Sequence, residues 1–187
     1  MKVPAQPILI LGSQRYAYAD PPYFGCGQRL YGKQHPDAAI WDDKQTHINL
    51  VNRLVAEYPD GWALSCNSKD LRWLLPACPE DARVAPWVKT WHQIRPTTTQ
   101  FAWEPVIWCG GRKDPKRTPM VRDWMQANAT RQKGTAGAKP PEFCRWILDL
   151  LNAQNVDTID DLFPGSGAVT HAVDAWKRQR TLWEPNI

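Results

Sequence analysis

Hydrophobic and polar positions follow two periods along the chain, and the change of period predicts helices and strands in turn. Apolar residues recur at helical spacing in THINLVNRLVAEY (46–58), and Pro59 and Gly61 end the run. Short apolar and aromatic runs predict strands at 8–12, 15–19, 62–66, 83–91, 101–109, 157–163 and 181–184. Further helices are predicted at 68–75, 140–154 and 167–179, and a loop at 24–43. Strands that alternate with helices indicate an α/β protein with parallel strands and right-handed crossovers.

Two polar segments stand directly after predicted strands. Asp20, Pro21, Pro22 and Tyr23 follow the strand 15–19. Taken alone, the two prolines end a strand and Tyr23 covers the edge of a core.

The second segment is DDLFPGSGAV (160–169), a strand that ends in a glycine-rich turn and opens a helix. Glycines let the backbone approach a small molecule, and the N–H groups at a helix start favour its polar or anionic end. Such turns are common, so this one is weak evidence by itself. Glu184 ends the next predicted strand, where a carboxylate grips a ribose in doubly wound sheets, although taken singly a surface acid is the simpler interpretation.

The positive charge of the chain is concentrated in one segment. Residues 110–140 contain eight basic and two acidic residues, whereas the whole chain has a net charge of +4 and is therefore mildly acidic elsewhere. Such a run is either a solvated loop or the contact surface for a polyanion. Among the eleven tryptophans, Trp124 lies within this segment and is a candidate for stacking on a base.

Cysteine usage and hydropathy bear on compartment and metal binding. The five cysteines are odd in number and widely spaced, without a C-x-x-C pair, and the four histidines do not cluster with them. We therefore expect reduced thiols, no metal site and a cytoplasmic location. The sequence predicts neither a signal peptide nor a membrane span.

Five segments together resemble the amino-methyltransferases of DNA, which use S-adenosylmethionine to methylate an exocyclic nitrogen of a base. DPPY (20–23) resembles their catalytic motif, and DLFPGSG (161–167) resembles their cofactor motif. KPPEFCRWILDLL (139–151) is similar to the Lys-Pro segment and the helix before the cofactor strand. WEPVIWCGG (103–111) and LWEPNI (182–187) resemble the family's E-P-I-L strand and its acidic segment.

The resemblance implies a doubly wound, mostly parallel, seven-stranded Rossmann-like sheet. The motif order, with the catalytic motif first, matches the circularly permuted branch of the family. A single domain is expected, with a catalytic half (1–109), a basic DNA-contact segment (110–138) and a cofactor-binding half (139–187). The segment 110–138 is short for a target-recognition region, which suggests a short or relaxed target sequence or reliance on a homodimer partner.

The resemblance also implies site residues. The catalytic set is Asp20, Pro21, Pro22 and Tyr23, and the set that binds S-adenosylmethionine is Lys139, Pro140, Asp161, Phe163, Gly165, Ser166, Gly167 and Glu184. The residues expected to contact DNA are Phe24, Arg112, Lys113, Lys116, Arg117, Arg122, Trp124 and Arg131. The chain departs from the family at Ala168 and Val169, where threonines are usual, so Thr170 is the nearest hydroxyl.

In the expected chemistry, the Asp20 carboxylate and the Pro21 carbonyl accept hydrogen bonds from the amine of a flipped-out adenine, and the Tyr23 ring stacks on the base. The aspartate in the tetrad favours adenine N6 by resemblance. The alternatives are cytosine N4, an amine of RNA or of a free nucleotide, and a non-catalytic nucleic-acid-binding subunit with the same fold.

Overall fold

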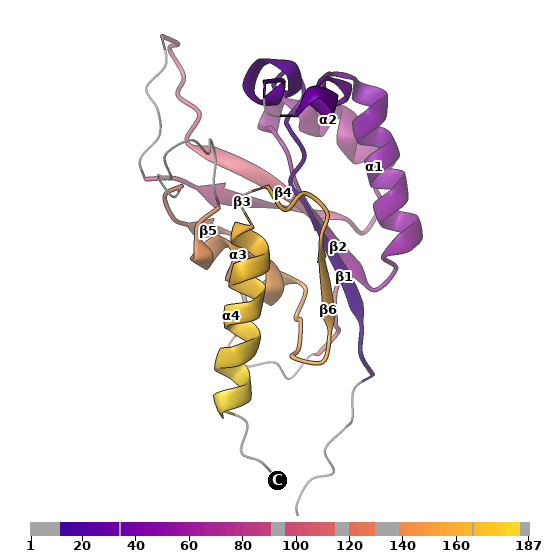
Figure 1. The fold of residues 1–187 in the computed structure, drawn as a ribbon, viewed down its shortest axis with the longest axis vertical. Helices are drawn as coiled ribbons and strands as arrows, with labels where there is room; N and C mark the ends of the chain where they lie inside the picture. Colours follow the sequence, from indigo (N-terminus) through magenta and orange to yellow (C-terminus); the bar gives the residue numbers. More distant parts are fainter. Residues whose placement is uncertain are drawn as a thin grey trace, which may run out of the picture.

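A six-stranded sheet forms the centre of the part of the chain that the structure describes (Figure 1). The computed structural model describes residues 12–33, 35–90, 96–114, 120–129, 139–165 and 167–183, with the side chains of the last helix up to 178. The strands are β1 (Arg15–Ala19), β2 (Gly61–Ser65), β3 (Arg83–Val88), β4 (Trp103–Gly110), β5 (Met125–Gln126) and β6 (Thr158–Asp161). Their order across the sheet is β5-β3-β4-β2-β1-β6.

The sheet is mixed, because one strand runs against the others. β1 pairs in parallel with both β2 and β6, and β3 pairs in parallel with β5. β4 is antiparallel to both β2 and β3. The first residues of β4 therefore lie at the same edge of the sheet as the carboxyl ends of the other strands.

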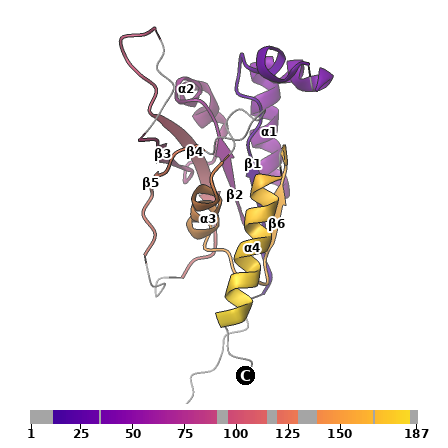
Figure 2. The same ribbon diagram turned by 60° about the vertical axis from the view of Figure 1, so that its left-hand side comes forward.

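Helices cover both faces of the sheet, as Figures 1 and 2 show. The helices are α1 (Lys44–Glu57), α2 (Leu71–Leu74), α3 (Pro141–Leu150) and α4 (Ala168–Trp183). Alternate residues of β1 supply the two cores: Tyr16 and Tyr18 pack with α3 and α4, whereas Ala17 and Ala19 pack with α1 and α2. The aromatic side chains therefore fill the α3–α4 side, and small residues leave room for the α1 side.

Local sequence explains where the two main helices of these cores begin. The Asp43 carboxylate accepts a hydrogen bond of 2.9 Å from the backbone N–H of Thr46 and so caps α1. Pro141 occupies the first turn of α3, where a missing N–H costs nothing. α1 then buries the apolar face that its spacing predicts, namely Leu50, Val51 and Leu54.

The α/β class and most predicted elements are confirmed, with four differences, one of which is β5, a strand that no sequence pattern predicted. The segment 24–43 is more ordered than a loop, since it contains a π-helical turn (Gly27–Tyr31) and a 3-10 helix (Pro36–Asp42). The strand predicted at 181–184 is wrong over its described residues, because α4 continues to Trp183. Seven strands are not confirmed, since the described residues form six, and residues 8–11 of the first predicted strand lie outside them.

Candidate active site

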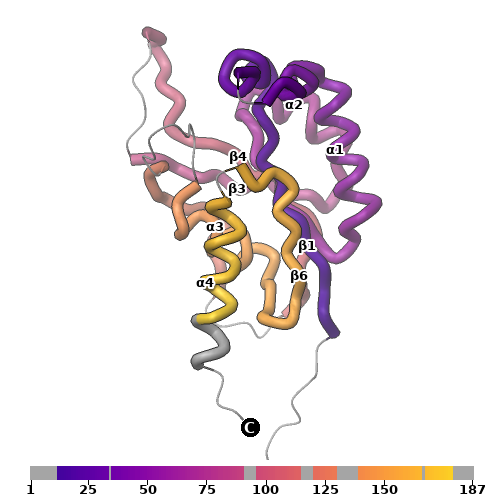
Figure 3. Tube along the Cα trace, in the orientation of Figure 1, coloured from indigo at the N-terminus to yellow at the C-terminus, as the bar shows by residue number. Residues whose placement is uncertain are grey.

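The two predicted motifs lie side by side at the carboxyl edge of the sheet. β1 and β6 are parallel neighbours with Tyr18 paired to Asp161, and the Leu162 N–H donates to the Tyr18 carbonyl at 3.0 Å. Asp20 and Phe163 each follow two residues after this register pair. The early and late parts of the chain therefore meet at this edge, where the tube of Figure 3 shows them running together.

The Asp20 carboxylate is held by a lysine. The Lys139 Nζ lies 2.9 Å from both Asp20 carboxylate oxygens, and the lysine side chain is only 6% exposed. Asp20 itself is 25% exposed, so solvent or a substrate can reach it. Burial raises the pKa of Asp20, and the neighbouring ammonium opposes this rise. Lys139 was expected beside the cofactor; the structure places its ammonium beside the Asp20 carboxylate.

Tyr23 is fixed by its hydroxyl, which donates a hydrogen bond of 2.8 Å to Glu104 Oε2. Burial raises the pKa of Tyr23 well above its usual value, so the phenol stays protonated and remains a donor. Within the tetrad, Pro21 is buried and Pro22 is half-buried. Glu104 belongs to the predicted strand 101–109, and its residue type alone indicated no function.

The glycine turn after β6 has a backbone that only glycine adopts readily. Gly165 and Gly167 have φ of +48° and +78°, and the Gly167 N–H donates to the Pro164 carbonyl at 2.6 Å. Nothing lies closer than 3.8 Å to a Cβ built at Gly165, so the turn is open on that side. The turn leads directly into α4, whose N-terminal N–H groups suit a polar or anionic ligand group.

Asp161 ends β6 and organises the start of this turn. Its carboxylate accepts hydrogen bonds from the Phe163 N–H at 3.3 Å and from Thr170 Oγ1 at 3.2 Å. Burial raises the pKa of Asp161, and these two donors oppose the rise. Thr170, the nearest hydroxyl after Ala168 and Val169, is therefore bonded to Asp161.

A row of five aromatic rings connects the glycine turn with the segment after the tetrad. Phe163 packs against Trp41 with ring centroids 4.9 Å apart, and Trp41 packs against His47 at 5.2 Å. His47 contacts Trp73 at 5.7 Å, and Trp73 contacts Phe24 at 5.9 Å. Phe24 is thus the last ring of this row. Trp41 and Trp73 carried no signal in the sequence beyond their residue type.

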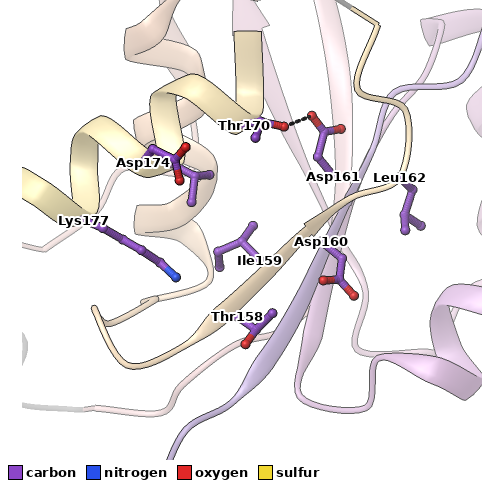
Figure 4. Close-up of a pocket in the computed structure, with 9 residues that line it drawn as sticks. Thr158, Ile159, Asp160, Asp161, Leu162, Thr170, Asp174 and Lys177 are labelled. Atoms are coloured by element: carbon purple, nitrogen blue, oxygen red, sulfur yellow. Dashed lines mark hydrogen bonds between the residues drawn. The ribbon is translucent and has the colours of Figure 1, made fainter. Parts of the chain in front are cut away.

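A cavity of about 450 Å³ lies between β6 and α4 (Figure 4). Asp161 and Thr170 are at one end of it, and Lys177 lines it further along α4. Of the residues expected to bind the cofactor, Asp161 lines this cavity. Neither Asp20 nor the glycines of the turn line this cavity. The candidate site is therefore the edge of the sheet where Asp20 and the glycine turn lie.

Arg112 is a correction to the expected DNA-contact set. Its guanidinium lies 2.6 Å from the fully buried Asp157 carboxylate, and the arginine side chain is 6% exposed. A charge that is buried and paired in this way is not presented to a phosphate. Arg112 therefore supports the fold.

Three other members of the expected DNA-contact set have exposed side chains. Lys113 and Arg122 are exposed, and the Arg122 guanidinium lies 5.5 Å from the ring centre of Trp124, which is 43% exposed. The remaining predicted site residues lie outside the described residues: Lys116, Arg117, Arg131, Ser166 and Glu184.

Every helix in the described ranges is too short or too polar to span a bilayer. The same residues contain no group of three or more His, Cys, Asp or Glu side chains arranged to hold a metal ion.

Two solved structures have a similar fold. The complex of M1.HpyAVI with SAM superposes with a TM-score of 0.59 at 15% identity, over 88% of this chain and 79% of that chain. A second structure, M1.HpyAVI, gives a TM-score of 0.56 at 15% identity, over 88% and 78%. No family model and no curated protein matches the sequence. At this identity the likeness establishes the fold.

Proposed function

We propose that this chain transfers a methyl group from S-adenosylmethionine to the exocyclic N6 amine of adenine in DNA, with a short or relaxed target sequence. The observation that carries the proposal is the pairing of β1 with β6, since it brings the DPPY tetrad and the glycine turn together at one edge of the sheet. The complex of M1.HpyAVI with SAM has a similar fold, which supports S-adenosylmethionine as the cofactor. The motif order agrees with a circularly permuted member.

The residues of the glycine turn fit the proposed cofactor. The positive φ values of Gly165 and Gly167 keep side chains out of the turn, and the N-terminus of α4 follows it. Asp161 and Phe163 border the same turn, and Pro140 is the buried residue that precedes α3. When bound, the cofactor would supply an activated methyl group on a sulfonium. Ser166 and Glu184 complete the proposed set.

The tetrad would prepare the amine for attack. The lone pair of an adenine amine is conjugated with its ring, so the nitrogen is a weak nucleophile. The Asp20 carboxylate and the Pro21 carbonyl would accept its two N–H groups and favour a tetrahedral nitrogen with an exposed lone pair. The prolines fix the backbone direction of that carbonyl. Asp20 would take the proton that the amine loses, and its partial exposure lets the proton pass to solvent.

The DNA would be held mainly through its backbone. Lys113 and Arg122 can neutralise phosphates, and Trp124 offers an exposed ring face. A base within a duplex cannot reach Asp20, so the target adenine must be flipped out. Stacking on the Tyr23 ring would stabilise the flipped base by roughly 1–3 kcal/mol. Contacts of this kind read little sequence, which agrees with a relaxed target.

Methyl transfer from labelled S-adenosylmethionine to mixed-sequence duplex DNA tests the proposal. Asp20→Ala should lower transfer by about 10²- to 10⁴-fold and leave cofactor binding measurable by calorimetry. Asp37→Ala is the matched control, because Asp37 is an exposed aspartate in the first turn of a 3-10 helix. Digestion of the product to nucleosides and mass analysis should identify N6-methyladenine.

The other outcomes separate the alternatives. N4-methylcytosine would keep the reaction and change the base, and label found only in RNA or nucleotides would change the substrate. Cofactor and DNA binding without transfer to any of these would favour a non-catalytic subunit.

A further inference from the structure

Glu104 is a largely buried carboxylate that the proposed reaction does not use. It stands at the start of β4, opposite Trp87 of β3, and the reversed direction of β4 brings it to the edge where β1 ends. Its side chain is 24% exposed. The carboxylate receives the Tyr23 hydroxyl at 2.8 Å, forms an ion pair with Lys89, and lies 3.8 Å from Lys139 Nζ.

These contacts form a row of alternating charges that ends at Asp20. The order is Lys89, Glu104, Lys139 and Asp20, and each inner member touches an opposite charge on both sides. A burial of this depth is costly for an unpaired charge, so the row is stable only as a unit. The ammonium groups lower the pKa of Glu104, although burial alone would raise it.

Lys139 is shared between two carboxylates. Its Nζ is 2.9 Å from Asp20 and 3.8 Å from Glu104, and the Tyr23 hydroxyl is 3.5 Å away. An ammonium has three donors, and a carboxylate has about four acceptor positions. Because the Lys139 ammonium is attracted to Glu104 as well as to Asp20, the Asp20 carboxylate keeps acceptor positions for the N–H of a substrate amine. Without Glu104, the lysine would pair with Asp20 alone.

We propose that Glu104 is a positioning residue for Asp20 and Tyr23: it restrains Lys139 electrostatically, which leaves Asp20 able to accept the substrate amine, and it holds the Tyr23 ring by its hydroxyl. The identity of that amine rests on the proposed function. Glu104 itself does not contact the reacting atoms. Two separable effects follow, one on the charge of Asp20 and one on the orientation of Tyr23.

Titration of the Asp20 carboxyl by carbon-13 NMR in the substrate-free protein tests the first effect, with Asp20→Asn to assign the signal. Glu104→Gln removes a neighbouring negative charge and should lower the pKa of Asp20, because Glu104 raises it. Lys139→Met removes a positive charge and should raise it. Lys89→Met should shift it in the same direction by less, and it replaces Lys139→Met if that variant fails to fold.

Other groups face Asp20 and are left intact in these variants. They come from β1, the tetrad, the π-helical turn, α3 and β6, and they are Tyr18, Tyr23, Tyr31, Cys144 and Asp161. Glu57→Gln is the matched control, since Glu57 is an exposed carboxylate at the end of α1 and pairs with Arg53. It should not move the titration. An Asp20 titration unchanged by Glu104→Gln, or moved in the same direction as by Lys139→Met, would overturn the proposal.

Methyl transfer tests the second effect. Glu104→Gln should lower kcat by about ten- to hundredfold at constant KM for the cofactor. It should also move the acid limb of the kcat–pH profile to lower pH, because the pKa of Asp20 falls. Tyr23→Phe keeps the ring and should lower kcat without moving that limb. An equal loss of kcat in both variants, with the acid limb unchanged in each, would mean that Glu104 has a purely structural role. If the wild-type protein methylates none of the offered substrates, the proposed function fails, whereas the NMR titration still reports the coupling of Glu104 to Asp20.

Discussion

The Arg112 guanidinium and the Asp157 carboxylate form a buried ion pair, with a distance of 2.6 Å between Nη2 and Oδ1. The pair connects the segment after β4 with the start of β6. Asp157 also accepts the backbone N–H groups of Gln14 at 2.8 Å and Gln154 at 2.7 Å. Gln14, the residue before β1, is therefore bonded to the same carboxylate as Arg112. Asp157 thus holds together the starts of β1 and β6, the two strands that lead into the candidate site.

Removing the arginine of this pair should destabilise the protein strongly. Arg112→Met leaves Asp157 buried without its counter-charge, so the free energy of unfolding should fall by about 3–5 kcal/mol in urea denaturation. Arg53→Met is the control, because Arg53 pairs with Glu57 on the surface of α1. That change should cost no more than about 0.5 kcal/mol. Equal costs for the two variants would contradict the anchoring role.

The exposed cations of the basic segment should govern the salt dependence of DNA binding. Each phosphate contact contributes about 0.9 to the slope of log K against log salt concentration. Lys113→Gln and Arg122→Gln should therefore each reduce the slope by about 0.9. Arg53→Gln, on the distant exposed face of α1, should leave it unchanged. Anisotropy titrations over a series of salt concentrations measure the slope, and an unaltered slope in both variants would place the DNA elsewhere.

The five tyrosines should resist ionisation until the fold opens. Burial raises the pKa of Tyr18, Tyr23, Tyr31 and Tyr58, and it raises that of Tyr16 to about 12. Since each folded pKa lies above the unfolded value of 10.0, this contribution to stability is complete below pH 10 and is lost as the pH rises through the folded values.

Tyrosinate absorbance measures this directly. The native protein should show little absorbance at the pH where the chain in guanidinium is half titrated. Its free energy of unfolding should then fall as the pH rises from about 10 to about 12. A native titration curve that coincides with the denatured one would contradict the burial of these phenols.

Two glycines with the same backbone conformation should differ in their tolerance of alanine. Gly25 has φ of +76° with nothing within 4 Å of a built Cβ, whereas Gly110 has φ of +75° and its Cβ would lie 2.7 Å from the Asp60 carbonyl oxygen. Gly25→Ala should cost about 1–2 kcal/mol, which is the left-handed penalty alone. Gly110→Ala should cost a further 1–3 kcal/mol or so from the backbone clash. Thermal denaturation compares them, and equal shifts would argue against close approach at Gly110.

Much of the fold was predictable because the apolar patterns agree with the tertiary structure. The spacing in 46–58 and 140–154 predicted α1 and α3, and RYAYA (15–19) coincides with β1. The final strand was mispredicted because Thr181–Trp183 favour a strand locally but continue the helical period of α4. β5 has only two residues within a polar segment, so its pairing with β3 is set by tertiary contact.

The two motifs of the candidate site were recognisable in sequence, but their electrostatic surroundings were not. Lys139 was expected at the cofactor because its motif precedes the cofactor strand, and the fold turns its ammonium toward Asp20. The role of Glu104 depends on the antiparallel register with Trp87, which periodicity does not reveal. Arg112 stands in a basic run, and its burial depends on an ion pair with Asp157, a residue far away in the sequence.

The row of rings from Phe163 to Phe24 also has a thermodynamic consequence. Its two ends belong to the segments expected to hold the methyl donor and the base, so an ordering of one end restricts the other through rigid contacts. Linkage then requires reciprocity: whatever factor the donor adds to nucleic-acid affinity, nucleic acid adds to donor affinity. Under the proposed function, the packing of these five side chains would therefore couple the binding of the two ligands.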